Sequence, residues 1–301
     1  MLKASAIIAV HNGQAFIADA VRSVFAQTCK DLELIVVDDA STDCTPDIVQ
    51  TLMQAAPIPM QYLRNEQNLE RCFSRNRGAA QAVGKYLFFL DYDDMWQPDY
   101  IETILHTFST TNADMVCSIL RTKINEQGQI IYSSRKVLPN DVGILSAAAL
   151  IGGTPGVAVQ KASFVQYDDA FRFREDWELV LRTFLSGLKI AIDDSNKVLV
   201  REHGKRTSRA NPKYYHASLR IYETYRKKIP LQYQPFFDFE IGSVALRYGD
   251  MWRGWKLVAS ALPRHATIWQ NPRNWLMLFK RGFRIDRWLS PSLRSQGEHV
   301  K

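Results

Sequence analysis

Residues 85–94 read Lys85-Tyr-Leu-Phe-Phe-Leu-Asp91-Tyr-Asp93-Asp94, an apolar run that ends on three carboxylates within four residues. The apolar part has the length and composition of a buried strand. Carboxylates this close repel one another and lose hydration on burial, so they need a cation or a polar partner to be stable. The stretch therefore predicts a strand whose end holds a metal ion together with an anionic ligand.

The residues around this stretch alternate between short apolar runs and helical patterns. Strands are predicted over residues 5–10, 32–37, 60–63 and 86–90, and helices over 16–27, from Pro46, over 71–83 and after Pro98. Strands that alternate with helices in this way form parallel sheets covered by helices. The fold class is therefore α/β, with a Rossmann-like, mostly parallel central sheet flanked by helices.

Polar side chains follow three of the predicted strands. His11 and Asn12 follow the first, Asp38 and Asp39 follow the second, and the aspartates from Asp91 follow the fourth. In open α/β sheets, ligands bind beyond the carboxyl ends of the strands. We therefore expect these three groups to line one crevice.

Composition bounds the kind of protein that the chain forms. Its 301 residues, 46% apolar and 23% charged, suffice for one large domain or two modest ones. The four cysteines have irregular spacings, and the N-terminus lacks the pattern of a secretion signal, so a reducing cytoplasm without disulfides is expected. No stretch approaches the roughly 18–20 uninterrupted apolar residues that cross a bilayer. We expect a cytoplasmic protein that does not span the membrane.

Basic charge is concentrated in the C-terminal third. Residues 1–200 hold 18 Lys and Arg against 24 Asp and Glu, whereas residues 201–301 hold 20 against 7 and five of the seven tryptophans. Helices are predicted over 214–228, 235–248, 252–262 and 272–283. Cationic helices with Trp and Phe on one side suit an anionic membrane surface, although tryptophans at helical spacing also suit a packed core. We predict a basic, Trp-rich helical extension over 211–301. Its helices either contact the inner face of the plasma membrane peripherally or pack on the rest of the chain. No pattern indicates nucleic-acid binding.

Five segments in succession resemble the motifs of family 2 glycosyltransferases, which have the GT-A fold. They are Ala6-Ile-Ile-Ala-Val-His11-Asn12, Ser23-Val-Phe-Ala-Gln27-Thr28, Glu33-Leu-Ile-Val-Val-Asp38-Asp39-Ala-Ser41-Thr-Asp43, residues 68–76, and Phe89-Leu-Asp91-Tyr-Asp93-Asp94. Further on, Arg174-Glu175-Asp176-Trp177-Glu178-Leu179 with Arg182 resembles the family's ED motif. The resemblance covers about residues 4–210. It implies a GT-A catalytic domain over 1–210, with a nucleotide-binding half over about 1–97 and an acceptor half over about 98–210.

The resemblance also implies a donor-nucleotide site. Its residues are Ala9, His11, Asn12, Asp39, Arg71, Arg75 and Asp93. Asp39 is expected to accept the N3 hydrogen of uracil or thymine, and Asp93 to contact the ribose. His11 stands where the family usually has a tyrosine that stacks on the base, and a structural role is open for it as well. Arg71 and Arg75 are expected to neutralise the diphosphate or to contact the base.

A metal and a general base complete the implied site. Asp94, Asp91 and His203 are the candidate metal residues, and Mn²⁺ or Mg²⁺ is the expected cofactor, because these cations prefer oxygen ligands. Asp176 is the candidate base, because a neighbouring acid and partial burial raise the pKa of a carboxylate; stabilising a helix N-terminus is the alternative role for Glu175 and Asp176. The loop that contacts the acceptor or the diphosphate is expected to contain Glu175, Trp177, Arg201 and Lys205.

The sequence thus predicts an inverting, metal-dependent glycosyltransferase. The resemblance implies a hexosyl- or N-acetylhexosaminyltransferase that uses a UDP-linked sugar, or a dTDP-linked one, and a hydroxyl of a glycan or lipid-linked acceptor in cell-surface polysaccharide biosynthesis. Two alternatives remain open. A phosphotransferase of the haloacid dehalogenase type also has a strand that ends in an Asp-x-Asp sequence. A non-catalytic protein that binds nucleotides or glycans needs the crevice but not the base.

Overall fold

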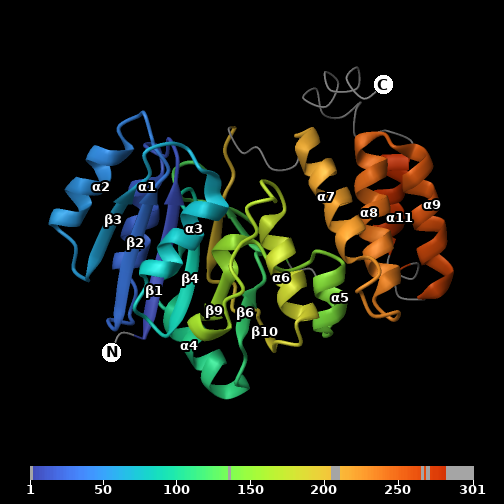
Figure 1. Ribbon diagram of the computed structural model, residues 1–301, viewed down its shortest axis with the longest axis horizontal. Helices are drawn as coiled ribbons and strands as arrows, with labels where there is room; N and C mark the ends of the chain where they lie inside the picture. The colour runs from blue at the N-terminus through green and yellow to red at the C-terminus, as the bar shows by residue number, and fades with distance from the viewer. Residues whose placement is uncertain (1–2, 135–136, 205–210, 266–267, 269–271, 283–301) are drawn as a thin grey trace. The chain divides into compact units, whose positions relative to one another are not determined.

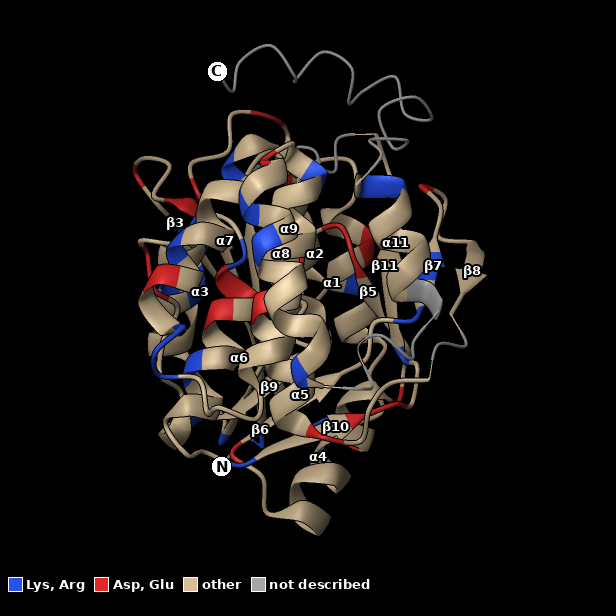
Figure 2. Cartoon of the chain, turned by 90° about the vertical axis from the view of Figure 1, so that its right-hand side faces the viewer, with Lys and Arg blue, Asp and Glu red and all other residues tan. Residues whose placement is uncertain are grey.

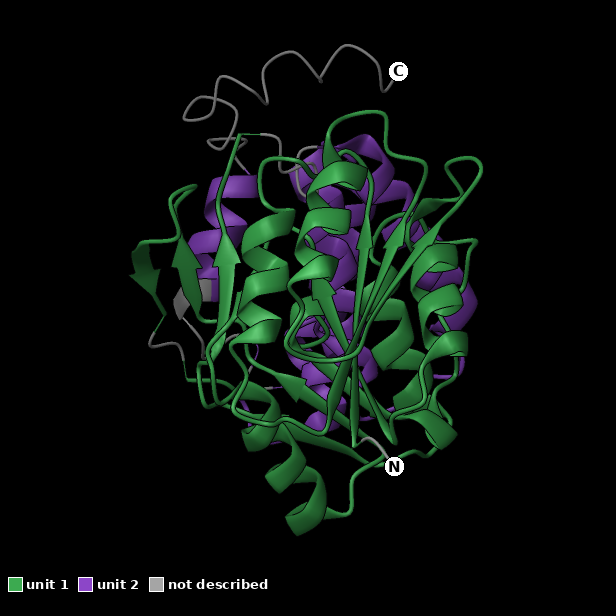
Figure 3. Ribbon diagram, turned by 90° about the vertical axis from the view of Figure 1, so that its left-hand side faces the viewer, with its two compact units in different colours: residues 1–138, 151–205 green, residues 139–150, 206–301 purple. Residues whose placement is uncertain are grey.

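A computed structural model describes residues 3–134, 137–204, 211–265, 268 and 272–282 of the chain (Figure 1). The chain divides into two compact units (Figure 3). The first comprises Met1–Leu138 and Ile151–Lys205, and the second comprises Pro139–Leu150 and Arg206–Lys301. Residues 139–150 therefore group with the C-terminal helices, although they lie within the range predicted for the acceptor half.

A seven-stranded sheet in the order β10-β6-β9-β4-β1-β2-β3 forms the centre of the described part of the first unit. Its strands are β1 (Ala4–Val10), β2 (Leu32–Asp38), β3 (Met60–Arg64), β4 (Tyr86–Asp91), β6 (Met115–Ser118), β9 (Val157–Gln160) and β10 (Ile190–Asp193). All neighbouring strands run parallel except β9, which is antiparallel to both β4 and β6. The predicted α/β fold with a mostly parallel sheet is confirmed, and the reversed strand β9 is a feature that the sequence pattern did not indicate.

Helices cover both faces of this sheet. They are α1 (Ile17–Phe25), α2 (Thr45–Gln54), α3 (Glu70–Gln81), α4 (Tyr100–Thr111) and α6 (Glu175–Leu185), with short 3-10 turns η1 (Thr154–Gly156) and η2 (Lys161–Ser163). Side chains of α1, α2 and α4 share one core with alternate residues of β1, β2 and β4, among them Ile8. Helix α3 packs against the other face, where a Cβ atom at Gly78 would lie 2.7 Å from Cγ2 of Ile7. Glycine thus allows α3 to approach β1 closely.

A second, four-stranded sheet has the order β5-β11-β7-β8. Its strands are β5 (Met95–Trp96), β7 (Thr122–Ile124), β8 (Ile130–Ser133) and β11 (Val198–Arg201). Strand β11 is antiparallel to β5, with Leu199 opposite Met95. Because β5 directly follows the acidic stretch, this pairing brings the residues after β11 to Asp93 and Asp94.

The second unit consists of helices: α5 (Val142–Ala147), α7 (Pro212–Tyr225), α8 (Gln234–Tyr248), α9 (Met251–Ala261), the 3-10 turn η3 (Leu262–Arg264) and α11 (Pro272–Gly282). Helix α8 is buried along most of its length and contacts α5, α7, α9 and α11. A Cβ atom at Gly254 of α9 would lie 2.6 Å from Cγ of Leu246, so this glycine permits the close packing of α8 and α9. In the described ranges, no helix has both the length and the apolar character needed to traverse a bilayer.

Candidate active site

The register of the parallel strands brings the predicted polar groups to one edge of the sheet. Ala9 of β1 pairs with Asp91 of β4, and Val10 pairs with Asp38 of β2. The backbone N–H of Asp39 donates to the carbonyl oxygen of Val10 (2.8 Å). Since β1 lies between β2 and β4, the groups that follow all three strands meet beyond its carboxyl end.

Three carboxylates form an acidic cluster at this edge. One oxygen each from Asp91, Asp93 and Asp94 lies within 4.8 Å of the others. Asp93 Oδ2 lies 2.9 Å from Nε2 of His203, and Oδ1 of the fully buried Asp94 accepts a hydrogen bond from the backbone N–H of Arg201 (2.8 Å). Oxygen donors at this spacing fit a single hard divalent cation such as Mn²⁺ or Mg²⁺.

Asp39 is held by groups from the neighbouring elements. Its Oδ1 accepts hydrogen bonds from Nδ2 of Asn65 (2.7 Å) and from the backbone N–H of Leu69 (2.8 Å). Nδ1 of His11 lies 2.7 Å from the carbonyl oxygen of Asp39, while Nε2 of His11 lies 3.1 Å from Nδ2 of Asn12. Since an amide NH₂ group only donates, the ring carries its hydrogen on Nδ1. Hydrogen bonds on both sides fix the plane of the His11 ring.

The aspartate before it has a different environment. The buried Asp38 carboxylate accepts hydrogen bonds from the backbone N–H of Ser41 (2.8 Å), the hydroxyl of Tyr62 (2.6 Å) and Nη1 of Arg64 (2.7 Å). Both of its oxygens are therefore engaged within the protein. Asp38 holds the turn after β2 in place.

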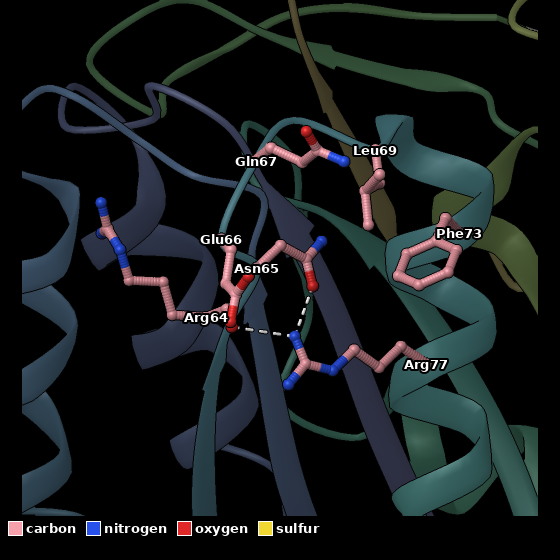
Figure 4. Close-up of a pocket in the computed structure, with 7 residues that line it drawn as sticks. All are labelled: Arg64, Asn65, Glu66, Gln67, Leu69, Phe73 and Arg77. Atoms are coloured by element: carbon pink, nitrogen blue, oxygen red, sulfur yellow. Dashed lines mark hydrogen bonds between the residues drawn. The ribbon is translucent and has the colours of Figure 1, made fainter.

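A pocket of about 290 Å³ opens between the end of β3 and the start of α3 (Figure 4). Its lining residues are Arg64, Asn65, Glu66, Gln67, Leu69, Phe73 and Arg77. Nη1 of Arg77 donates to Oδ1 of Asn65 and to the carbonyl oxygen of Arg64 (Figure 4). Asn65 and Leu69 also bind Asp39, so the pocket adjoins that carboxylate.

The buried side chain of Arg75 joins the acidic cluster to helix α6. Its Nη2 donates to Asp91 Oδ1 (2.7 Å), and its Nη1 donates to Glu175 Oε1 (3.0 Å). Arg71, one turn earlier on α3, lies 3.6 Å from the same Glu175 oxygen, and its side chain is 45% exposed. Because this buried guanidinium lies between two carboxylates, it fixes the end of β4 and the start of α6 relative to α3.

Asp176 lies in the first turn of α6. Its Oδ1 accepts a hydrogen bond from the backbone N–H of Trp177 (2.7 Å). Burial and the neighbouring carboxylate of Glu175 raise the pKa of Asp176 from its ordinary value of 3.8 to about 6. A carboxylate with this pKa is ionised at neutral pH and is a stronger base than an ordinary aspartate.

Other predicted site residues contact mainly the protein itself. Trp177 is buried, with the Arg174 guanidinium 4.0 Å from the centre of its ring. The fully buried Arg201 donates through Nε to the carbonyl oxygen of Asp93 (2.9 Å) and through Nη2 to Asp19 Oδ2 (2.9 Å). Arg201 therefore holds the turn that contains the acidic cluster. Lys205 lies outside the residues that the structure describes.

Tyr167 is a candidate that the sequence did not indicate. It lies in an irregular segment before α6, and Asn76 of α3 anchors its backbone through two hydrogen bonds of 2.8 Å. The side chain is buried, with the Arg75 guanidinium 5.1 Å from the ring centre. Within the described ranges, its hydroxyl has no hydrogen-bond partner. Burial raises the pKa of Tyr167, and among the charges that act on this phenol are those of Arg75, Asp176 and Asp91. No motif or periodicity marks such a residue, because its position depends on contacts with α3.

The fold and the acidic edge define an α/β protein with a mostly parallel sheet and a carboxylate cluster at its strand ends, and comparison with known proteins identifies the family. The family model "Glycosyl transferase family 2" matches residues 5–162. An uncharacterized glycosyltransferase of Nostoc sp. is 35% identical over 111 residues, which cover 37% of this chain and 34% of that protein. A putative colanic acid biosynthesis glycosyl transferase, WcaA of Escherichia coli, is 24% identical over 249 residues, covering 76% of this chain and 85% of the relative. Crystal structures of S. aureus TarS 1-349 in complex with UDP and with UDP-GlcNAc have TM-scores of 0.57 at 15% identity, covering 90% of this chain and 91% of theirs.

The chain belongs to Glycosyl transferase family 2, since the family model matches just over half of it. The family resemblance seen in the sequence is thereby confirmed, and the haloacid dehalogenase alternative is wrong. The match spans about a third of the Nostoc relative's length. Members of this family typically use a divalent cation bound through an Asp-x-Asp motif, and an acidic group of Asp91, Asp93 and Asp94 is present here.

Proposed function

We propose that this protein is an inverting, metal-dependent glycosyltransferase that transfers a sugar from a UDP-linked donor to a hydroxyl of a glycan or lipid-linked acceptor in cell-surface polysaccharide biosynthesis. The observation that carries the proposal is the link through Arg75 between the acidic cluster and the first turn of α6, which holds a base of raised pKa. A non-catalytic binding protein would not need that base. The name of the E. coli relative supports a role in polysaccharide biosynthesis, and the titles of the TarS complexes support a UDP-linked donor.

The donor nucleotide is proposed to bind along the edge formed by β1, β2 and β4. Asp39 accepts the N3 hydrogen of the base, and the ring of His11, fixed by two hydrogen bonds, packs against it. Asp93 contacts the ribose. Asp91 and Asp94 would hold a divalent cation with the diphosphate, and when bound it would stabilise the negative charge of the departing nucleoside diphosphate.

Transfer is proposed to occur in one displacement. Asp176 takes the proton from the acceptor hydroxyl, and the acceptor oxygen forms a bond to the anomeric carbon. The bond between that carbon and the diphosphate oxygen breaks, and its electron pair leaves with the nucleoside diphosphate. The configuration at the anomeric carbon inverts because attack and departure occur on opposite sides.

Arg75, Glu175 and Arg201 are proposed as positioning residues. Arg75 and Glu175 tie the base to the acidic cluster, and Arg201 holds the turn that contains that cluster. We assign Tyr167 a positioning role. Its buried hydroxyl, on which the charge of Asp176 acts, is proposed to donate to that carboxylate during the reaction, since leaving it unpaired would cost about 1–3 kcal/mol.

The Tyr167→Phe variant is expected to retain or slightly gain stability while kcat/KM falls roughly tenfold or more. Removing an unpaired buried hydroxyl removes a desolvation cost, whereas the lost hydrogen bond to a charged or reacting group weakens catalysis. Thermal unfolding and steady-state kinetics measure the two effects. A variant that loses stability but keeps full activity would show that the hydroxyl has a structural partner.

UDP is expected to raise the melting temperature only when Mn²⁺ or Mg²⁺ is present. At a UDP concentration about 100-fold above Kd, the stabilisation is about 2.7 kcal/mol, which corresponds to roughly 5 °C for a chain of this size. Thermal shift with each metal, with UDP or dTDP, and with EDTA measures it. The shift should be lost in Asp93→Asn and kept in Asp169→Asn, which changes an exposed acid outside the cluster.

A shift that is the same with EDTA would contradict the metal site. The absence of any shift with either nucleotide would contradict the donor site itself. Donor hydrolysis, screened over a set of nucleotide sugars with Mn²⁺, then identifies the sugar.

A further inference from the structure

Helices α9 and α11 expose large apolar side chains on one face each. On α9, Trp252 is 79% and Trp255 41% exposed, and with Lys256 they follow the spacing of one helix face. On α11, Trp275 is 50% and Phe279 55% exposed, one turn apart. The opposite sides of these helices face the core of the unit, where Val258 and Leu278 are buried. Helical spacing alone is compatible with either a core or a surface position, and these tryptophans lie at the surface.

The two exposed faces adjoin each other. A Cβ atom at Gly282 of α11 would overlap the indole ring of Trp255 of α9, at 2.4 Å from Cζ2. Glycine at this position thus lets the indole lie directly on the end of α11. The two faces form one surface, called here the Trp face, which consists of Trp252, Trp255, Lys256, Trp275, Leu276, Phe279 and Lys280.

The two helices that carry the Trp face are basic. The sequences of α9 and α11 contain no Asp or Glu, and their basic residues are Arg253, Lys256, Arg273, Lys280 and Arg281 (Figure 2). Nζ of Lys256 lies 5.9 Å from the centre of the Trp252 ring. Arg253 pairs with Asp250, the residue before α9, at 3.7 Å, and Arg281 donates to Ser243 of α8, so Lys256 and Lys280 are the cations that belong to the Trp face itself. Asp238 of α8 is paired with Arg226 and Arg264.

We propose that the Trp face binds the surface of a membrane that contains anionic lipids. Exposed indole and phenyl rings partition into the headgroup region of a bilayer, and Lys and Arg beside them attract anionic headgroups. A protein partner would bury the rings equally well, but the absence of acidic residues from both helices favours a uniformly negative surface. The membrane contact is independent of the proposed transfer reaction and would hold this chain where lipid-linked acceptors are found.

Co-sedimentation of the full chain with phosphatidylcholine vesicles, with and without phosphatidylglycerol, tests this proposal. The protein should bind the vesicles that contain phosphatidylglycerol and should dissociate as salt is added. Trp252→Ser combined with Trp275→Ser should weaken binding at least about tenfold, through loss of apolar burial. Lys256→Glu replaces a positive charge with a negative one, and each unit of charge changed should weaken vesicle binding roughly fivefold.

Matched controls lie in the same unit outside the Trp face. Leu231→Ser changes a side chain that is 77% exposed, and Lys227→Glu reverses another exposed charge. Both should bind vesicles like the unchanged protein. The proposal is overturned if phosphatidylglycerol does not promote binding, or if the controls weaken binding as much as the Trp-face variants. Sedimentation without lipid tests the alternative that the Trp face binds a second copy of this chain. That alternative would hold if the protein were a dimer, if only the Trp252→Ser/Trp275→Ser variant lost the dimer, and if no vesicle binding were seen.

Discussion

Asp176→Asn is expected to lower the rate of sugar transfer by roughly 10²- to 10⁴-fold, the contribution typical of a positioned general base. Asparagine keeps the oxygen that accepts the hydrogen bond from Trp177 N–H, so the first turn of α6 should be preserved. UDP binding with Mn²⁺ should be unchanged, because the carboxylates of the acidic cluster remain. Transfer assays and the UDP thermal shift, measured on the same preparation, separate the two properties. Normal transfer by this variant would remove Asp176 from the mechanism.

The pH profile provides a second readout of the same residue. The base acts only when ionised, so kcat/KM should fall as the pH drops through about 6, the raised pKa of Asp176. Because this pKa is higher in the folded than in the unfolded chain, the folded state binds the proton more tightly. The contribution of Asp176 to stability is therefore present at low pH and is lost as the pH rises from about 4 to about 6. Asp176→Asn lacks this loss and should be more stable at pH 7, by up to about 3 kcal/mol.

Arg75→Met is expected to destabilise the protein by about 3–5 kcal/mol, the cost of removing one partner from a buried ion pair. The change leaves Asp91 without the guanidinium at 2.7 Å and removes from Glu175 the nearer of its two arginine partners in the described part of the chain, Arg71 being the more distant one. The positive charge of Arg75 also lowers the pKa of Asp176, so its loss should move the acid limb of the pH profile upward. Urea unfolding and a pH–rate profile measure the two consequences.

Arg71→Met is the matched control for this experiment. It removes a guanidinium from the same helix and the same Glu175 oxygen, but at 3.6 Å and from a side chain that is 45% exposed. The Glu175 carboxylate is buried in both pairs, but the Arg71 guanidinium is farther from it and partly solvated, so its removal should cost less stability than the removal of Arg75. Equal destabilisation by the two variants would contradict the structural role that we give to Arg75.

Much of the fold was predictable from local pattern. The apolar run before Asp91 and the alternation of strands with helices gave the parallel sheet, because burial on both faces makes such strands continuously apolar. The carboxylates of the acidic cluster are also neighbours in the sequence, so their proximity follows directly from the order of the residues. Asp176, in contrast, was identified through a family motif, since an acidic pair at a helix start is common in proteins that have no base there.

The relations between distant segments were not predictable. Strand β9 enters the sheet in the reverse direction, and β11 pairs with β5 to bring Arg201 and His203 to the acidic cluster. The environment of the Tyr167 hydroxyl, which has no hydrogen-bond partner among the described residues, is likewise defined only by the chain segments that surround it. Helical spacing of Trp252 and Trp255 suited either a core or a surface, and only the packing of α9 on α8 shows which side is exposed.

The α/β class, the family and the aspartates at the end of β4 follow from the amino-acid sequence alone, because each is expressed in consecutive or periodic residues. How these aspartates are used depends on the tertiary structure. The carboxylate at the end of β4 and the one at the start of α6 share the guanidinium of Arg75 only because α3 places it between them. Such a contact depends on the order and spacing of elements in three dimensions, which no short stretch of sequence encodes.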